Sequence, residues 1–210
     1  MENKNFKIMD LLVTPIRRLN HIKRFSFVPC VRVENVAEHS YFVTLYALYL
    51  ARYWISKGIN IDVLRLMEAS VLHDVEESMT GDIIRSFKYF NPVLKKEIDK
   101  AAMEMLSSVF KDTESNIKEH FIQRIEKAKD ETIEGRILAF CDLVSVYAYC
   151  LEEIRIWNKN MVDVFKEAQS YVYVFKDICD GFFNPFVEEI EAIDPETFNH
   201  SYYNFVPLNK

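Results

Sequence analysis

The hydrophobic residues of this chain recur at spacings of three and four almost throughout, and no run alternates apolar and polar residues with β-branched side chains. Spacings of three and four place apolar residues on one face of an α-helix, whereas strict alternation is typical of β-strands. The pattern therefore predicts an all-α protein. The predicted helices cover approximately residues 6–22, 36–57, 63–75, 92–110, 114–127, 131–157, 161–180 and 185–192.

Capping residues place the starts of several of these helices. Asn35 followed by Glu38 matches a capping box, in which each side chain accepts a hydrogen bond from the backbone of the other residue. The other predicted caps are Asp62, Asp130 and Asn91, the last followed by Pro92 at the first helical position. Residues 76–90, between two predicted helices, are expected to be irregular.

The length and composition are those of one globular domain, predicted to span residues 1–210. The net charge is −6 and the acidic residues are spread along the chain, so the basic face expected of a nucleic-acid binder is missing. A nucleic-acid polymer is therefore not an expected partner. A small anionic substrate is compatible with this charge, because a bound cation reverses the local sign inside a pocket.

Several protein classes are excluded by what the chain lacks. Its four glycines are isolated, which rules out a phosphate-binding P-loop or a dinucleotide-binding turn. The longest uncharged runs, Tyr41–Ala51 and Leu143–Leu151, are far shorter than the ~20 residues that span a bilayer, so no membrane partner is expected. The four cysteines form no C-x-x-C pair and are interpreted as free thiols of a cytoplasmic protein.

Four polar residues occupy predicted helices where burial would be costly. Asp142 is the one acid in the mostly apolar helical stretch Arg136–Tyr149. A buried carboxylate needs a cation or several hydrogen-bond donors. A metal ion or a tyrosine or arginine from another helix would satisfy it equally well. His73 and Asp74 end an apolar stretch, and His39 precedes another; alone, each would more often be a structural residue. Together they form a nitrogen and oxygen set that suits one divalent Mn, Fe, Co, Ni or Zn ion.

The order His39 … His73-Asp74 … Asp142 resembles the HD superfamily of metal-dependent phosphohydrolases, and the surrounding sequence resembles its 5′-deoxynucleotidase branch. That resemblance implies an HD-type helical bundle that hydrolyses deoxynucleoside 5′-monophosphates. The matching stretches lie between about residues 17 and 155. They are Arg24-Phe25, Arg32–Ser40, His73–Asp82, Lys88–Asn91, Asp142 and Cys150–Glu153.

The resemblance also implies roles for individual residues. Glu77 would orient or deprotonate the attacking water, whereas without the resemblance it would be interpreted as an exposed acid at a helix end. Asp82 would act as the leaving-group acid or contact the sugar hydroxyl. Arg24 and Lys88 are candidate phosphate clamps, although both could be surface charges. Phe25 stands where the family usually carries a tryptophan at the sugar end of the pocket, so weaker selection for deoxyribose is expected.

The expected partners are a nucleoside monophosphate substrate and a second copy of the chain. Members of this branch are commonly homodimers, and the C-terminal helices over residues 161–192 would cover the bundle or pair two subunits. Two other functions fit the same residues. One is hydrolysis of a phosphodiester, a nucleoside triphosphate or a non-nucleotide monoester, and the other is a non-catalytic metal or nucleotide sensor.

Overall fold

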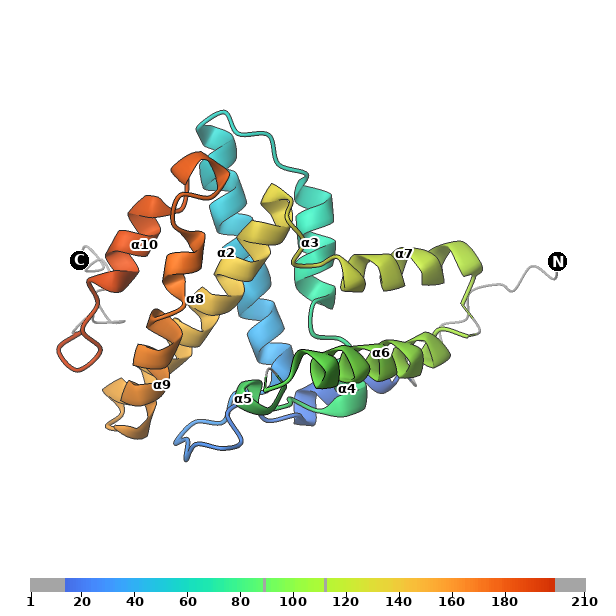
Figure 1. Cartoon of the computed structure of the whole chain (residues 1–210), viewed down its shortest axis with the longest axis horizontal. Helices are drawn as coiled ribbons and strands as arrows, with labels where there is room; N and C mark the ends of the chain where they lie inside the picture. Colours follow the sequence, from blue (N-terminus) through green and yellow to red (C-terminus); the bar gives the residue numbers. More distant parts are fainter. Residues whose placement is uncertain (1–13, 89, 112, 199–210) are drawn as a thin grey trace, which may run out of the picture. The chain divides into compact units, whose positions relative to one another are not determined.

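The computed structural model describes residues 14–88, 90–111 and 113–198 (Figure 1). In this part of the chain the regular elements are all helices, and the one β-type contact is an isolated antiparallel bridge between Lys23 and Asn35. The all-α prediction is confirmed. None of the described helices combines the length and apolar character needed to cross a membrane.

Backbone contacts divide the chain after Val146 into two compact units. The prediction of one domain over residues 1–210 stays a prediction.

The first unit contains the 3₁₀-helix η1 and helices α2 to α7, and α8 continues from it into the second unit. These elements are η1 (Pro15–His21), α2 (Val36–Ser56), α3 (Val63–Leu72), α4 (Glu77–Thr80), α5 (Arg85–Lys88), α6 (Pro92–Val109), α7 (Ser115–Glu126) and α8 (Ile133–Arg155). The remainder are α9 (Asn160–Gln169), η2 (Val172–Phe175), η3 (Cys179–Gly181) and α10 (Asn184–Glu191).

Three predicted helix starts are confirmed by their hydrogen bonds. At α2 the backbone N–H of Glu38 donates to Asn35 Oδ1 at 2.9 Å, and that of Asn35 donates to Glu38 Oε2 at 3.2 Å. Asp62 accepts from the third residue of α3 at 2.9 Å, and Asn91 accepts from Val93 at 2.8 Å at the start of α6. Each cap satisfies a backbone donor that the first helical turn leaves unpaired.

The predicted cap of α8 is wrong. The helix begins at Ile133, and Thr132 Oγ1 accepts the backbone N–H of Gly135 at 3.3 Å. Asp130 instead accepts from the backbone and hydroxyl of Thr132. Gly135 permits this close turn, because a Cβ there would lie 2.3 Å from the carbonyl oxygen of Asp130.

Other boundaries also differ from the predictions. The helix expected over residues 161–180 ends at Gln169, and the positive φ values of Asp177, Cys179 and Asp180 exclude a continuous α-helix up to residue 180. The segment 76–90 contains the short helices α4 and α5. The first predicted helix is a 3₁₀-helix from residue 15, and its residues 6–13 lie outside the described part.

The first unit is held together by a cluster of buried apolar side chains. Figure 1 shows α2, α3, α6 and α7 in this unit, where α3 contacts both α2 and α7, and α6 contacts α4 and α7. Val75 of the turn after α3 belongs to the cluster and is 3% exposed. Burial of such a side chain contributes about 1.5–3 kcal/mol, which fixes the turn that begins at His73. The cluster consists of Leu19, Val36, Val75, Leu106, Phe110 and Ile125.

Candidate metal centre and active site

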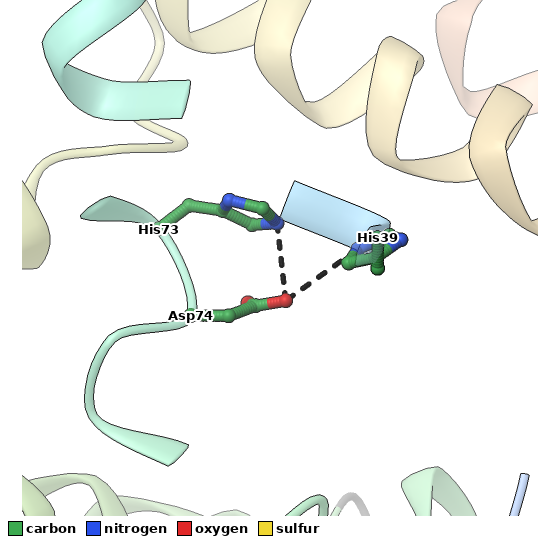
Figure 2. A group of neighbouring side chains, drawn as sticks. All are labelled: His39, His73 and Asp74. Atoms are coloured by element: carbon green, nitrogen blue, oxygen red, sulfur yellow. Dashed lines mark ion pairs between the residues drawn. The ribbon is translucent and has the colours of Figure 1, made fainter. Parts of the chain in front are cut away.

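Four side chains from three parts of the first unit converge on one point. His39 lies near the start of α2, His73 and Asp74 follow the last residue of α3, and Asp142 lies on α8. Figure 2 shows His39, His73 and Asp74 pointing toward one another. Asp74 Oδ2 lies 3.1 Å from Nε2 of His73 and 3.5 Å from Nε2 of His39. Asp142 Oδ1 lies 2.9 Å from Nε2 of His39 and 4.0 Å from Nε2 of His73.

The two imidazole Nε2 atoms are buried and form no hydrogen bond of acceptable direction, although carboxylate oxygens lie close to both. Buried polar atoms rarely remain unsatisfied in this way. A lone pair on each nitrogen and on each oxygen can share one cation at the centre of the group. Ligand atoms of His39, His73 and Asp74 all lie within 4.8 Å of one another, so these three residues form a candidate metal site.

Asp142 is held from both sides. Its Oδ1 faces the imidazoles, and its Oδ2 accepts a hydrogen bond from Lys129 Nζ at 2.6 Å. Burial opposes ionisation of Asp142, but Lys129 and His39 together hold its pKa well below the ordinary value. The charged partner of this carboxylate is thus a lysine rather than the tyrosine or arginine considered from the sequence. Asp142 is available as a fourth oxygen ligand, and that role stays a prediction.

The outward-facing Nδ1 atoms of the two histidines have different neighbours. Nδ1 of His73 lies 2.8 Å from the carbonyl oxygen of Ser70. Nδ1 of His39 lies 3.1 Å from Ser145 Oγ and 2.7 Å from Arg24 Nη1. Burial and the positive charge of Arg24 lower the pKa of His39 to about 4, so its imidazole is neutral at pH 7.

A second group of carboxylates adjoins the cluster. Glu77 begins α4, and its backbone N–H donates to the carbonyl oxygen of Asp74 at 3.1 Å. Burial, together with the negative charges of Asp74, Asp82 and Glu76, raises the pKa of Glu77 to about 9. Burial also raises the pKa of Asp82, although Arg24 opposes this. Carboxylates crowded in this way repel one another, and a divalent cation would offset that repulsion.

Arg24 and Phe25 are placed beside these carboxylates. Arg24 Nη1 donates to Glu34 Oε2 at 2.7 Å, and its backbone N–H donates to the carbonyl oxygen of Glu34 at 3.0 Å. The Phe25 ring lies 5.1 Å from the guanidinium carbon of Arg24, and the backbone N–H of Phe25 donates to Asp82. Phe25 is 8% exposed and has a φ of 53°, in the left-handed region.

Lys88 approaches the cluster through a cavity of about 900 Å³. His73, Asp74 and Glu76 form one part of its wall, and Lys88 and Lys129 also line it. Lys88 Nζ lies 3.6 Å from Oδ1 of Asp99, which also lines the cavity, so the two residues form an ion pair there.

The nine residues singled out in the sequence therefore lie in or around one site, but the sequence did not identify several of their neighbours. Lys129 and Ser145 lie outside the stretches that carry the resemblance, and their significance follows from their contacts with Asp142 and His39. Glu34 and Glu76 lie within the matching stretches Arg32–Ser40 and His73–Asp82, but the sequence predicts no site role for them.

The sequence of this chain is similar to those of known proteins. A family model described as 5′-deoxynucleotidase YfbR-like matches residues 12–190. A 5′-deoxynucleotidase from Photorhabdus laumondii is 31% identical over 179 residues, which cover 80% of this chain and 90% of that protein. The 5′-deoxynucleotidase YfbR from Escherichia coli O127:H6 is 31% identical over 151 residues, or 70% of this chain and 74% of that protein.

A solved structure gives the same fold. An HD-domain phosphohydrolase from Listeria innocua superposes with a TM-score of 0.72 at 23% identity, covering 87% of this chain and 89% of that one. The fold and family expected from the sequence are thereby confirmed. This chain belongs to the YfbR-like 5′-deoxynucleotidase family.

Proposed function

We propose that this protein releases phosphate from deoxynucleoside 5′-monophosphates, using one divalent metal ion held by His39, His73, Asp74 and Asp142. The observation that carries the proposal is the convergence of two buried, unsatisfied imidazole nitrogens and two carboxylates beside the further carboxylate of Glu77. Family membership supports the choice of a monoester substrate.

When bound, the ion supplies positive charge that acidifies water and offsets the charge of the phosphoryl oxygens. The nitrogen and oxygen ligand set fits Mn, Fe, Co, Ni or Zn. The overall reaction forms a bond between a water oxygen and phosphorus and breaks the ester P–O bond. The products are a nucleoside, whose 5′ oxygen gains a proton, and inorganic phosphate.

The protein groups divide this work by position. Glu77, which follows Asp74 by one turn, would be ionised once a bound cation offsets the neighbouring negative charges that raise its pKa, and it would then accept the proton of the attacking water. Arg24 binds phosphoryl oxygens with those of its N–H groups that do not donate to Glu34. Lys88 provides a second positive charge from the cavity that it shares with His73 and Asp74.

The sugar end of the substrate is assigned to Phe25 and Asp82. Asp82 is linked to the backbone of Phe25, so the two residues form one wall beside Arg24. Asp82 accepts a hydrogen bond from the sugar hydroxyl in this assignment. A phenylalanine ring fills less volume than tryptophan, so a ribose 2′-hydroxyl is rejected less strongly here.

The experiment that tests this function is a substrate panel on protein stripped of metal and reloaded with Mn, Co, Ni or Zn. Deoxynucleoside 5′-monophosphates are expected to release phosphate faster than bis-p-nitrophenyl phosphate or nucleoside triphosphates. Comparable or faster hydrolysis of the diester would reassign the protein as a phosphodiesterase. Metal binding without turnover of any compound would make it a sensor.

We also propose that the protein acts as a cytoplasmic homodimer. Large apolar side chains recur every four residues along one face of α2, and Tyr49, at 78% exposed, lies in the middle of them. The four residues are Tyr41, Leu45, Tyr49 and Tyr53. A dimer that buries this face would dissociate in Tyr49→Lys, as measured by light scattering. All four cysteines are free thiols, which supports a reducing compartment.

A further inference from the structure

Ser145 is a buried serine that contacts a proposed metal ligand. It is 2% exposed and lies on α8 three residues after Asp142, so one turn of the helix carries both. Its Oγ lies 3.1 Å from Nδ1 of His39, a residue 106 positions earlier in the chain. The same helical turn therefore reaches His39 twice, with the Asp142 carboxylate at Nε2 and with the Ser145 hydroxyl at Nδ1.

The position of the proton on His39 decides whether this residue can hold a cation. A neutral imidazole carries one proton, on Nδ1 or on Nε2, and only the unprotonated nitrogen has a lone pair to offer. Nε2 faces Asp74 and Asp142, so a cation at their centre needs the proton on Nδ1. A proton on Nδ1 in turn needs an acceptor within hydrogen-bond distance.

Among the described residues, two groups lie at Nδ1 of His39, and only one of these two can accept a hydrogen bond. Arg24 Nη1, at 2.7 Å, has N–H donors and no acceptor. The hydroxyl oxygen of Ser145, at 3.1 Å, has lone pairs and can accept. With the proton on Nδ1, Arg24 Nη1 and His39 Nδ1 would be two donors 2.7 Å apart, so metal binding requires the guanidinium to turn its N–H groups from His39 toward Glu34, which Nη1 already contacts at 2.7 Å.

We infer that Ser145 is a positioning residue whose hydroxyl accepts the Nδ1 proton of His39 and so leaves Nε2 free to bind the metal ion. This inference rests on the proposed metal-dependent function. His73 needs no such side chain, because its Nδ1 lies 2.8 Å from a main-chain carbonyl, that of Ser70. The two histidines thus differ in a way that one substitution can expose.

The test is a measurement of Zn²⁺ affinity on metal-free protein, by competition with a chromophoric chelator. Ser145→Ala removes the acceptor and is expected to weaken Zn²⁺ binding about 10- to 100-fold, the usual effect of losing such a partner. Ser145→Thr retains a hydroxyl and is expected to bind Zn²⁺ nearly as tightly as the parent.

Ser70→Ala is the matched control. Ser70 is 0% exposed, and its hydroxyl donates to the carbonyl oxygen of Leu66 at 2.8 Å rather than to a histidine. Its own carbonyl, which faces His73, is unaffected by the substitution. Zn²⁺ affinity should therefore remain close to that of the parent.

Unfolding curves of the metal-free variants show whether either serine is needed for folding. If Ser145→Ala does not fold, Ser145→Cys replaces it, and the poorer acceptor is expected to weaken binding several-fold.

Nitrogen NMR of the Zn²⁺-loaded parent supplies an independent readout, since the two ring nitrogens of each tautomer have distinct shifts. The proton of His39 is expected on Nδ1. Unchanged affinity in Ser145→Ala, or an equal loss in Ser70→Ala, would overturn the inference while leaving the proposed activity intact. A proton on Nε2 would overturn the inference and would also remove His39 from the proposed ligand set. A parent protein that binds no divalent ion would instead overturn the proposed function itself.

Discussion

Replacing Glu77 by glutamine separates metal binding from chemistry. The amide has the size of the carboxylate and keeps hydrogen-bonding capacity, but it cannot accept a proton from water. Glu77 is not one of the four proposed ligands, His39, His73, Asp74 and Asp142, so the metal content of the variant should equal that of the parent. Loss of a general base typically lowers kcat by 10²- to 10⁴-fold, which corresponds to about 3–5 kcal/mol of transition-state stabilisation.

The neighbouring residue Glu76 supplies the control. Both glutamates follow Asp74 closely, but Glu76 lines the cavity with Lys88, whereas Glu77 is influenced by Asp82 and Arg24. Glu76→Gln makes the same change from carboxyl to amide one position earlier in the chain, and kcat is expected to stay within a few-fold of the parent. The assay is phosphate release from a deoxynucleoside 5′-monophosphate, with metal content measured on the same samples.

If Glu77→Gln stays active while Glu76→Gln loses activity, the base has been assigned to the wrong residue. If both stay active, no carboxylate of this pair acts as the base.

Three further predictions concern metal content, the sugar and pH. Elemental analysis should find about one transition-metal ion per chain in the parent and little in Asp142→Ala or His73→Ala; full metal content in both variants would contradict the ligand set. Phe25→Trp should raise the ratio of kcat/KM for deoxyribo- over ribonucleotides, and a ratio that stays unchanged or falls would separate Phe25 from the sugar. The raised pKa of Glu77, about 9 against an ordinary 4.5, means that the folded metal-free protein binds more protons than the unfolded chain between these values. Its stability should therefore fall as pH rises from 7 to 9, by up to about 1.4 kcal/mol per pH unit from this group, and urea unfolding of Glu77→Gln should show a shallower fall. Equal slopes for parent and variant would contradict that pKa.

The parts of the fold that depend on neighbouring residues could be predicted from the sequence. The Asn35 capping box and the Asn91-Pro92 start of α6 involve partners within a few positions, so the pattern contains everything that forms them. The start of α8 was misplaced because two cap-forming residues, Asp130 and Thr132, lie close together, and their mutual hydrogen bonds decide which one caps the helix.

The candidate site, like the helix starts, could be predicted only in part from the sequence. Its acids and histidines could be proposed because they interrupt apolar helical stretches and match a family pattern. The contacts that position them could not, since they join distant segments. Ser145 reaches His39 across 106 residues, and Lys129 reaches Asp142 only because the turn before α8 folds back on the helix. Serine and lysine are common, and neither stands out until a partner is seen beside it.

The contact between His73 and the carbonyl oxygen of Ser70 has a consequence for exchanging ligands at this centre. The last carbonyls of a helix lack partners within the helix, and the imidazole at the end of α3 supplies a donor to one of them. Cysteine or aspartate at position 73 could still offer a ligand atom but no such donor. Exchange at this position would therefore change the end of the helix together with the ligand.

At position 39 the corresponding partner is a side chain on α8, so ligand and partner can be redesigned as a pair without disturbing a helix terminus. Attempts to retune the centre for a different ion have more freedom at His39 than at His73.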